Sequence, residues 1–159
     1  MAKKKAAKAA SRKPAARKTP AKRSSARPAR ATVTRGFTLS DGAISVTADD
    51  IQKSLAWYTD VLGFRVAQRW EQQGVLVGAE LAAGDVTMYL SQEDGKKGPR
   101  EKGQGVRLYW YTNQDIDKVA TGIKSRGGTL ASEPEDEWGV RSFNLQDPTG
   151  YLITVSSER

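Results

Sequence analysis

The residues that can do chemistry in this chain are carboxylates, hydroxyls and aromatics, because its 159 residues include no cysteine and no histidine. This composition excludes disulfides, thiol nucleophiles, zinc sites built on Cys or His, and an imidazole base. A metal held by carboxylates alone would be Mg²⁺ or Ca²⁺ rather than Zn²⁺, iron or Ni²⁺. A serine nucleophile would lack its usual histidine partner. The composition therefore favours binding over catalysis.

The carboxylates do not form an evident catalytic group. Asp49 and Asp50 open a predicted helix, where acidic residues cap the backbone and favour the helix dipole. Glu80 and Asp85 flank a predicted hairpin turn. The stretch "QDPTGYLITV" at 146–155 is typical of a turn that leads into a strand. Whether that hairpin only closes a sheet or also forms the wall of a site is the first structural question.

The positive charge of the chain is confined to its first 36 residues. These carry 13 Lys/Arg and no Asp/Glu, whereas the remainder carries 13 Lys/Arg and all 18 Asp/Glu, a net charge of −5. With almost no large apolar residue and with Pro14, Pro20 and Pro28 interrupting any helix, residues 1–36 are predicted to be a disordered polycationic arm. The folded domain is predicted to span 37–159.

The arm resembles the Lys/Ala/Pro-rich tails of linker histones, so non-specific binding to nucleic acid phosphates is one expectation. The cations nearest the start would make such contacts: Lys3, Lys4, Lys5, Arg12, Lys13, Arg17, Lys18, Lys22 and Arg23. The alternatives are an inert solubilising tail or a targeting segment. No apolar run approaches a membrane span or a secretory h-region, so we expect a cytoplasmic protein, nucleoid-associated where the arm binds DNA.

The pattern of the domain predicts strand, helix and three strands, twice over. Helices are expected at 49–63 and 113–128, where apolar residues recur at helical spacing. A polar loop at 93–105 separates the two halves, and the acidic run "EPEDE" at 133–137 is expected to be a solvated loop. Strands are expected at these ranges: 42–48, 64–72, 75–82, 85–92, 106–112, 129–133, 140–146 and 151–157.

A shift of 65 residues relates the two halves, placing Asp50 on Asp115 and Gly63 on Gly128. The matches mark the start and the end of the helix in each half. The prediction is an α+β fold of two βαβββ modules that form a curved mixed sheet around a cavity, where a ligand would bind.

Three runs together resemble the vicinal oxygen chelate superfamily of glyoxalase I, bleomycin-resistance proteins and extradiol dioxygenases. They are "DIQKSLAWYTDVLGFRV", "DIDKVATGIKSRGG" and "WGVRSFNLQDPTGYLITV". The resemblance covers roughly residues 40–157 and is most specific where Tyr58 lies in the first run and Asp-Pro-x-Gly in the last. It implies a homodimer whose cavity binds a small molecule.

Metal enzymes of that superfamily hold a divalent ion with His or Glu on four strands. The resemblance places these positions at Ala43, Tyr89, Leu108 and Thr154, with Val106 and Arg107 as alternatives for the third. None is a good ligand for a first-row dication. The resemblance therefore implies a metal-free member, in which the general base of the metal enzymes is also missing.

The same positions are expected to point into the cavity. Alternation along the strands adds Ser45, Thr87, Ser91, Trp110 and Leu152 to this face, and the segment containing Trp138 and Arg141 resembles one that lines or lids the pocket. Each assignment has an alternative. Tyr89 and Trp110 can belong to the core, Trp138 to an interface, Arg141 to an ion pair with Asp136 or Glu137, and Thr154 to an ordinary strand.

The sequence thus predicts a metal-independent domain that binds a small, partly aromatic molecule by sequestration, with no cofactor. The acidic run at 133–137 would attract a cationic ligand. One alternative is a lyase- or dioxygenase-type enzyme of the same superfamily. Another is an architectural protein that associates with nucleic acid through residues 1–36 while the domain dimerises.

Overall fold

The computed structural model describes residues 42–95 and 102–157 of the chain, all of which belong to one compact unit. The predictions made for the arm at 1–36 lie outside the described residues. Within these residues the elements run β1 (Ile44–Ala48), α1 (Ile51–Ala56), η1 (Trp57–Val61), β2 (Arg65–Gln72), β3 (Val75–Ala83), β4 (Val86–Gln92), β5 (Arg107–Thr112), α2 (Ile116–Ser125), β6 (Leu130–Glu137), β7 (Val140–Gln146) and β8 (Leu152–Ser157). No helix among them is long and apolar enough to span a bilayer.

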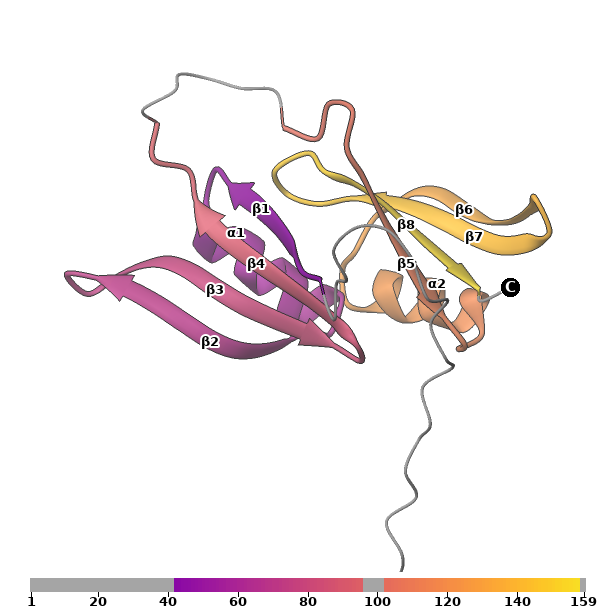
Figure 1. Cartoon of the computed structure of the whole chain (residues 1–159). Coiled ribbons are helices and arrows are strands. Elements are labelled where there is room, and N and C mark those ends of the chain that lie inside the picture. The colour runs from indigo at the N-terminus through magenta and orange to yellow at the C-terminus, as the bar shows by residue number, and fades with distance from the viewer. Residues whose placement is uncertain (1–41, 96–101, 158–159) are drawn as a thin grey trace, which may run out of the picture. The chain divides into compact units, whose positions relative to one another are not determined.

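The strands form two four-stranded mixed sheets of the same topology, β1-β4-β3-β2 and β5-β8-β7-β6 (Figure 1). In each sheet the first strand pairs in parallel with the fourth, and the remaining pairs are antiparallel. The predicted α+β fold of two βαβββ modules is confirmed, with each module contributing one sheet. We call β1–β4 with the first helix the first module, and β5–β8 with α2 the second.

The first helix begins where the Asp50 side chain accepts a hydrogen bond of 3.1 Å from the backbone N–H of Lys53. It buries Ile51, Leu55 and Tyr58 against its sheet and widens into a π-turn over Trp57–Val61. A π-turn accommodates one extra residue in the helix. Gly63, at a φ of 82°, then ends the helix in the left-handed conformation that favours glycine.

Each sheet buries one face against its own helix and leaves the other face open. On the helix-facing side the buried residues are Val46, Ala79, Leu81, Met88 and Leu90 in the first module, and Leu108, Phe143, Leu145, Ile153 and Val155 in the second. Side chains in a strand alternate between faces, so the residues between these point to the open faces. The open faces remain accessible to solvent in the described residues, since Tyr89 is 39%, Tyr109 53% and Tyr111 59% exposed.

Strand β6 is longer than predicted. The acidic run at 133–137, which was expected to be a loop, forms its second half and pairs with β7 as far as Glu137. The register shifts between Ser132 and Glu135, where Pro134 has no N–H to donate. The strand then turns at Trp138 and Gly139, both at positive φ. The loop prediction for this run was therefore wrong, although its acidic side chains are solvated.

The turn at 147–151 joins the two modules. Asp147 is 5% exposed, and its Oδ1 accepts hydrogen bonds of 2.8 to 2.9 Å from the backbone N–H groups of Thr149, Gly150 and Tyr151. Its Oδ2 accepts a hydrogen bond of 2.9 Å from the hydroxyl of Tyr58 in the first module. We call this turn, with its contacts to the first module, the latch.

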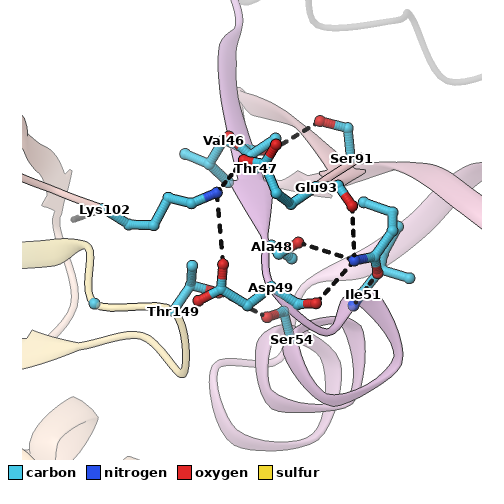
Figure 2. A network of polar contacts seen from close by, with 12 residues as sticks. Val46, Thr47, Ala48, Asp49, Ile51, Ser54, Ser91, Glu93, Lys102 and Thr149 are labelled. Atoms are coloured by element: carbon cyan, nitrogen blue, oxygen red, sulfur yellow. Dashed lines mark hydrogen bonds and ion pairs between the residues drawn. The ribbon is translucent and has the colours of Figure 1, made fainter. Parts of the chain in front are cut away.

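Further contacts close the same junction. The hydroxyls of Thr149 and Ser54 share a hydrogen bond of 3.2 Å, and both side chains are visible beside the first helix in Figure 2. Lys102 reaches from the segment before β5 to Glu93 and Asp49. Burial alone would lower the pKa of Lys102, but its hydrogen bond and charge contact with Glu93 raise it overall. The lysine therefore stays charged and fastens this segment to the first module.

Candidate ligand-binding site

The open face of the first module carries an aromatic pair and a carboxylate. Tyr89 is the register partner of Ser45 on one side and of Glu80 on the other. Its ring centroid lies 5.9 Å from that of Trp70. Beside it lies a shallow hollow of about 370 Å³, lined by Gly42, Ala43, Glu80, Thr87 and Tyr89. The structure thus brings Ala43, Ser45 and Tyr89 together on one exposed surface, as expected from alternation.

The open face of the second module is built around Thr154. Its register partners are Tyr109 and Asn144, and its hydroxyl donates a hydrogen bond of 2.7 Å to Asn144 Oδ1. The same hydroxyl oxygen accepts a 3.5 Å contact from the guanidinium of Arg107. The rings of Tyr109 and Tyr111 stack along this face with centroids 6.4 Å apart. The Thr154 hydroxyl is therefore held by Asn144 and Arg107, and Tyr109 and Tyr111 provide the exposed surface of this face.

Trp138 stands at the edge of this second face, on the tip of the β6–β7 hairpin. Its side chain is 85% exposed, and its indole N–H donates a hydrogen bond of 3.0 Å to Glu137. A small hollow of about 140 Å³ adjoins it, lined by Tyr109, Tyr111, Glu137, Trp138, Val140, Ser142 and Ser156. A large indole that is so exposed at a hairpin tip is typical of a surface that contacts a ligand or another protein chain.

Leu108 and Trp110 do not lie where the sequence analysis placed them. Leu108 is 4% exposed in the helix-facing core, and Trp110 packs on the same side against Phe64, with ring centroids 5.3 Å apart. A one-residue change of register moves every side chain of a strand to the opposite face. Arg107, Tyr109 and Tyr111 share the face of Thr154, and Arg107 is one of the two alternatives that the sequence offered for this ligand position.

The misplacement of Leu108 and Trp110 arises because the spacing between equivalent residues of the two modules is not constant. The helix caps Asp50 and Asp115 are 65 residues apart, but register relates Ile44 of β1 to Leu108 of β5, only 64 residues on. One additional residue stands between β5 and the cap of α2, where Asn113 and Gln114 replace the single Asp49. A fixed shift of 65 therefore points β5 the wrong way. The alternation of polar and apolar residues in "RLYWYT" was the available signal.

Arg141 also lies away from the open face. Its guanidinium donates two hydrogen bonds of 2.7 and 2.8 Å to the carboxylate of Asp117 on α2 and lies 3.3 Å from Asp136. The hydrogen bond to Asp117 raises the pKa of Arg141, and the same contact lowers the pKa of Asp117. The proposed cavity role of Arg141 is therefore not supported by its position, and the alternative of an ion pair with Asp136 is what the structure shows.

The residues at the four ligand positions do not fit a divalent metal. Ala43 offers no donor, the Thr154 hydroxyl is bonded to Asn144, and the guanidinium of Arg107 would repel a dication. Over residues 42–95 and 102–157, no group of three or more His, Cys, Asp or Glu side chains is arranged to hold a metal ion. The two faces instead offer aromatic rings with hydroxyl, amide and carboxylate groups, which suit stacking and hydrogen bonding.

Sequence reasoning missed part of this surface. It did not include Trp70, Glu80, Tyr109, Tyr111, Ser142, Asn144 or Ser156. The tyrosines were missed because of the one-residue register error in β5. The residues of β2, β3 and β7 were missed because the family's ligand positions lie on other strands, so no motif in the sequence marks them.

Comparison with known proteins places this geometry in a family. Residues 42–155 match the Glyoxalase/Bleomycin resistance protein/Dioxygenase superfamily. The glutathione transferase FosA of Serratia marcescens is 24% identical over 114 residues, which cover 70% of this chain and 76% of that protein. TioX from Micromonospora sp. ML1 superposes with a TM-score of 0.63 at 19% identity, over 76% of this chain and 99% of TioX.

A lactoylglutathione lyase from Agrobacterium tumefaciens has the same fold. It superposes with a TM-score of 0.58 at 16% identity, over 76% of this chain and 96% of the lyase. At these identities the solved structures establish the shared fold, while their individual activities belong to those proteins.

Proposed function

Because the chain belongs to the glyoxalase/bleomycin resistance protein/dioxygenase superfamily, we propose that it binds a small, partly aromatic molecule against its open sheet faces without a metal ion. The single observation that carries this proposal is where the exposed aromatic side chains gather. Five of the large hydrophobic residues that the described chain leaves exposed are aromatic: Trp70, Tyr89, Tyr109, Tyr111 and Trp138. All five lie on the open faces or at their hairpin edge.

Such exposure has a physical meaning. Isolated apolar residues on a surface are ordinary, but adjacent pairs of exposed aromatic rings on two sheet faces support a binding surface. Tyr109 and Tyr111 present rigid rings at little cost in side-chain entropy, and Ser142 beside them supplies a hydroxyl group that orients a polar ligand. The surface is therefore suited to a flat ligand with a few polar substituents.

We further propose that the protein works as a homodimer. The hollows on the open faces are shallow, whereas small-molecule sites enclose most of the ligand surface. Bringing an open face of one copy against an open face of a second copy would bury the exposed aromatics and close the hollows around a ligand. In this arrangement both copies contribute to one cavity.

The test is native mass spectrometry of the gently purified full-length protein, which reports stoichiometry, metal content and bound mass together. The expected result is a metal-free dimer that carries an additional small mass. The additional mass should disappear in the Tyr109→Ala, Tyr111→Ala double variant and remain in Gln52→Ala, which alters an exposed residue on the first helix. One divalent ion per chain would instead support the alternative of an enzyme of this superfamily.

A second function is favoured by the charge of residues 1–36, which carry 13 cations and no acid. We propose that these residues contact nucleic acid phosphates without sequence preference, and that dimerisation of the domain makes the attachment bivalent. Deleting residues 1–36 should abolish salt-sensitive retention on DNA while leaving small-molecule binding intact. Unchanged retention after the deletion would contradict this role.

A further inference from the structure

The junction between the modules has a hollow on the side that the latch does not fill. This cleft measures about 480 Å³ and lies between the β3–β4 hairpin and the segment that joins β5 to α2. Its walls are formed by Phe64, Val86 and Trp110, with Asp85, Asn113 and Gln114 at the rim, and it adjoins the second open face only at Tyr111. A volume of this size accommodates a small organic molecule.

The walls of the cleft are those of a site for an aromatic ring. Phe64 is 8% exposed and meets Trp110 at an interplanar angle of 51°, so the two rings form a tilted corner rather than a closed stack. Val86 completes an apolar surface on the hairpin side. A flat ring in this corner would contact both aromatic side chains, and such contacts stabilise beyond the area they bury.

One polar atom at the cleft lacks a partner. The indole N–H of Trp110 is buried and has no hydrogen-bond acceptor within residues 42–95 and 102–157. Leaving a buried donor unpaired is unfavourable, and nearly all buried donors in proteins are paired. The Trp110 side chain is itself only partly buried and lines the cleft, so a rotation of its ring toward the cleft would let the N–H donate to an acceptor there. An aromatic ring nitrogen is such an acceptor.

The rim adds a charge. Among the described residues that line the cleft, Asp85 is the sole carboxylate, and it stands exposed at the turn of the β3–β4 hairpin. The same set of described lining residues contains no Lys or Arg. A ligand amine at the mouth would therefore meet an anion without a competing protein cation among the lining residues.

We propose that this cleft is a second binding site, for a compact bicyclic heteroaromatic molecule that carries a ring-nitrogen acceptor and a protonated amine. The ring stacks in the Phe64–Trp110 corner, the ring nitrogen accepts from the Trp110 indole N–H, and the amine lies against Asp85. The site is contained within one chain and does not depend on the open-face site or on dimerisation.

The test uses matched probe compounds and the protein's own indole signals. The chain has four tryptophans, so a proton–nitrogen correlation spectrum of the full-length protein shows four indole resonances, and Trp110→Phe identifies the one from Trp110. We expect 3-(aminomethyl)quinoline to shift the Trp110 resonance downfield in a saturable manner. 2-(Aminomethyl)naphthalene, which lacks the ring nitrogen, should bind at least about fivefold more weakly and cause no such downfield shift. 3-(Hydroxymethyl)quinoline, which lacks the charge, should keep the shift at lower affinity.

Variants separate this site from the open faces. Asp85→Asn should weaken the aminomethylquinoline about three- to tenfold and leave the hydroxymethyl analogue unchanged. The Tyr109→Ala, Trp138→Ala variant alters two open-face residues that do not line the cleft, so it should leave both affinities unchanged, whereas it should abolish the binding proposed for the second open face. Failure of the open-face proposal is thus distinguishable from failure of this one.

Three outcomes would overturn the proposal. The first is a Trp110 resonance that does not respond while that of Trp138 does, which places the compound on the open face. The second is equal binding of the quinoline and the naphthalene, which removes any role for the indole N–H. The third is a Trp110 resonance that moves with protein concentration in the absence of any probe, which means that a second copy of the chain occupies the cleft.

Discussion

The two sides of the junction between the modules are built from equivalent elements but are filled differently. On one side the β7–β8 turn, residues 147–151, is packed against the first module as the latch. On the other side the β3–β4 turn is a tight hairpin in which Ala83 still pairs with Val86, and a cleft of about 480 Å³ remains beside it. A repeated module can therefore supply a structural contact at one junction and a binding space at the other.

The residues that follow the two helices also differ in how closely they are packed. Gly63 and Gly127 end the helices, at φ values of 82° and 85°, and the next residues are Phe64 and Gly128. Phe64 forms a wall of the cleft, whereas a Cβ on Gly128 would lie 2.6 Å from Val61 Cγ1. The crowded position thus requires glycine, and the open one holds a phenylalanine without filling the space.

The largest expected effect tests whether the latch is the dominant contact. Asp147→Ala removes the acceptor of three backbone N–H groups and leaves the buried Tyr58 hydroxyl without a partner. We expect the free energy of unfolding, measured by urea denaturation, to fall by about 3–4 kcal/mol. Asp85→Asn, at the corresponding turn of the other module, should change it by less than about 0.5 kcal/mol. Similar losses in the two variants would remove the distinction between the two turns.

The next effect tests the difference in crowding. In Gly128→Ala the new Cβ would lie 2.5 Å from Ile123 Cγ2 as well as close to Val61. Overpacking of this kind should cost about 2–3 kcal/mol in unfolding free energy. Gly63→Ala places its Cβ in open space, so only the left-handed backbone conformation opposes it, at about 1 kcal/mol. If Gly63→Ala proves the more damaging, the crowding attributed to Gly128 is wrong.

Alkaline pH isolates the buried hydroxyl of the latch. Burial, together with the charge of Asp147, raises the pKa of Tyr58 above its ordinary value of about 10. The unfolded chain therefore loses this proton before the folded protein does. Stability is retained below pH 10 and decreases above it, by about 1.4 kcal/mol per pH unit from this group. The contribution is specific to the latch, since the cleft contains no buried tyrosine hydroxyl among its walls.

Tyr58→Phe is the matching variant. It is less stable at neutral pH, because Asp147 loses a hydrogen-bond donor, but it lacks this alkaline dependence. The difference between the two proteins in urea unfolding free energy should therefore narrow from pH 10 to 11.5. Parallel pH profiles would show that the Tyr58 hydroxyl is not held as the structure indicates.

The sequence predicted the elements well, because their causes are local. Asp50 and Asp115 cap their helices through the N–H three residues on, and the alternation of apolar residues locates the strands. The same alternation places Tyr89 and Thr154 on the open faces, in strands that keep a spacing of 65 residues between modules. The contacts of Asp147 across the junction were beyond the sequence, because they join residues 89 apart and depend on packing.

The errors came from one-residue insertions, which leave almost no trace in composition. The π-turn at Trp57–Val61 adds a residue to the first helix, and the extra residue before Asp115 displaces β5 relative to the cap. These shifts move the repeat between 64 and 65 residues, which is enough to place Leu108 and Trp110 on the wrong face. The sequence predicted too short a strand β6 because Pro134 and the acidic run are typical of loops. In the structure a bulge accommodates them within the strand.

The smallest expected change in stability comes from variants at the hairpin tips of the two modules. Gln73 and Trp138 occupy the same position in two-residue turns, at φ values of 51° and 53°, each followed by a glycine. Asn is favoured at this position, and a bulky residue there is unfavourable. Trp138→Asn should therefore raise the unfolding free energy by about 0.5–1 kcal/mol while weakening binding at the second open face about tenfold. Gln73→Asn should raise stability by less and leave binding unchanged. A tryptophan that lowers stability at an exposed hairpin tip is explained by a contact with a ligand or with a second copy of the chain. If Trp138→Asn changes neither the ligand affinity nor the dissociation of the dimer, the second open face is not the binding surface. The cleft beside Trp110 then becomes the main candidate.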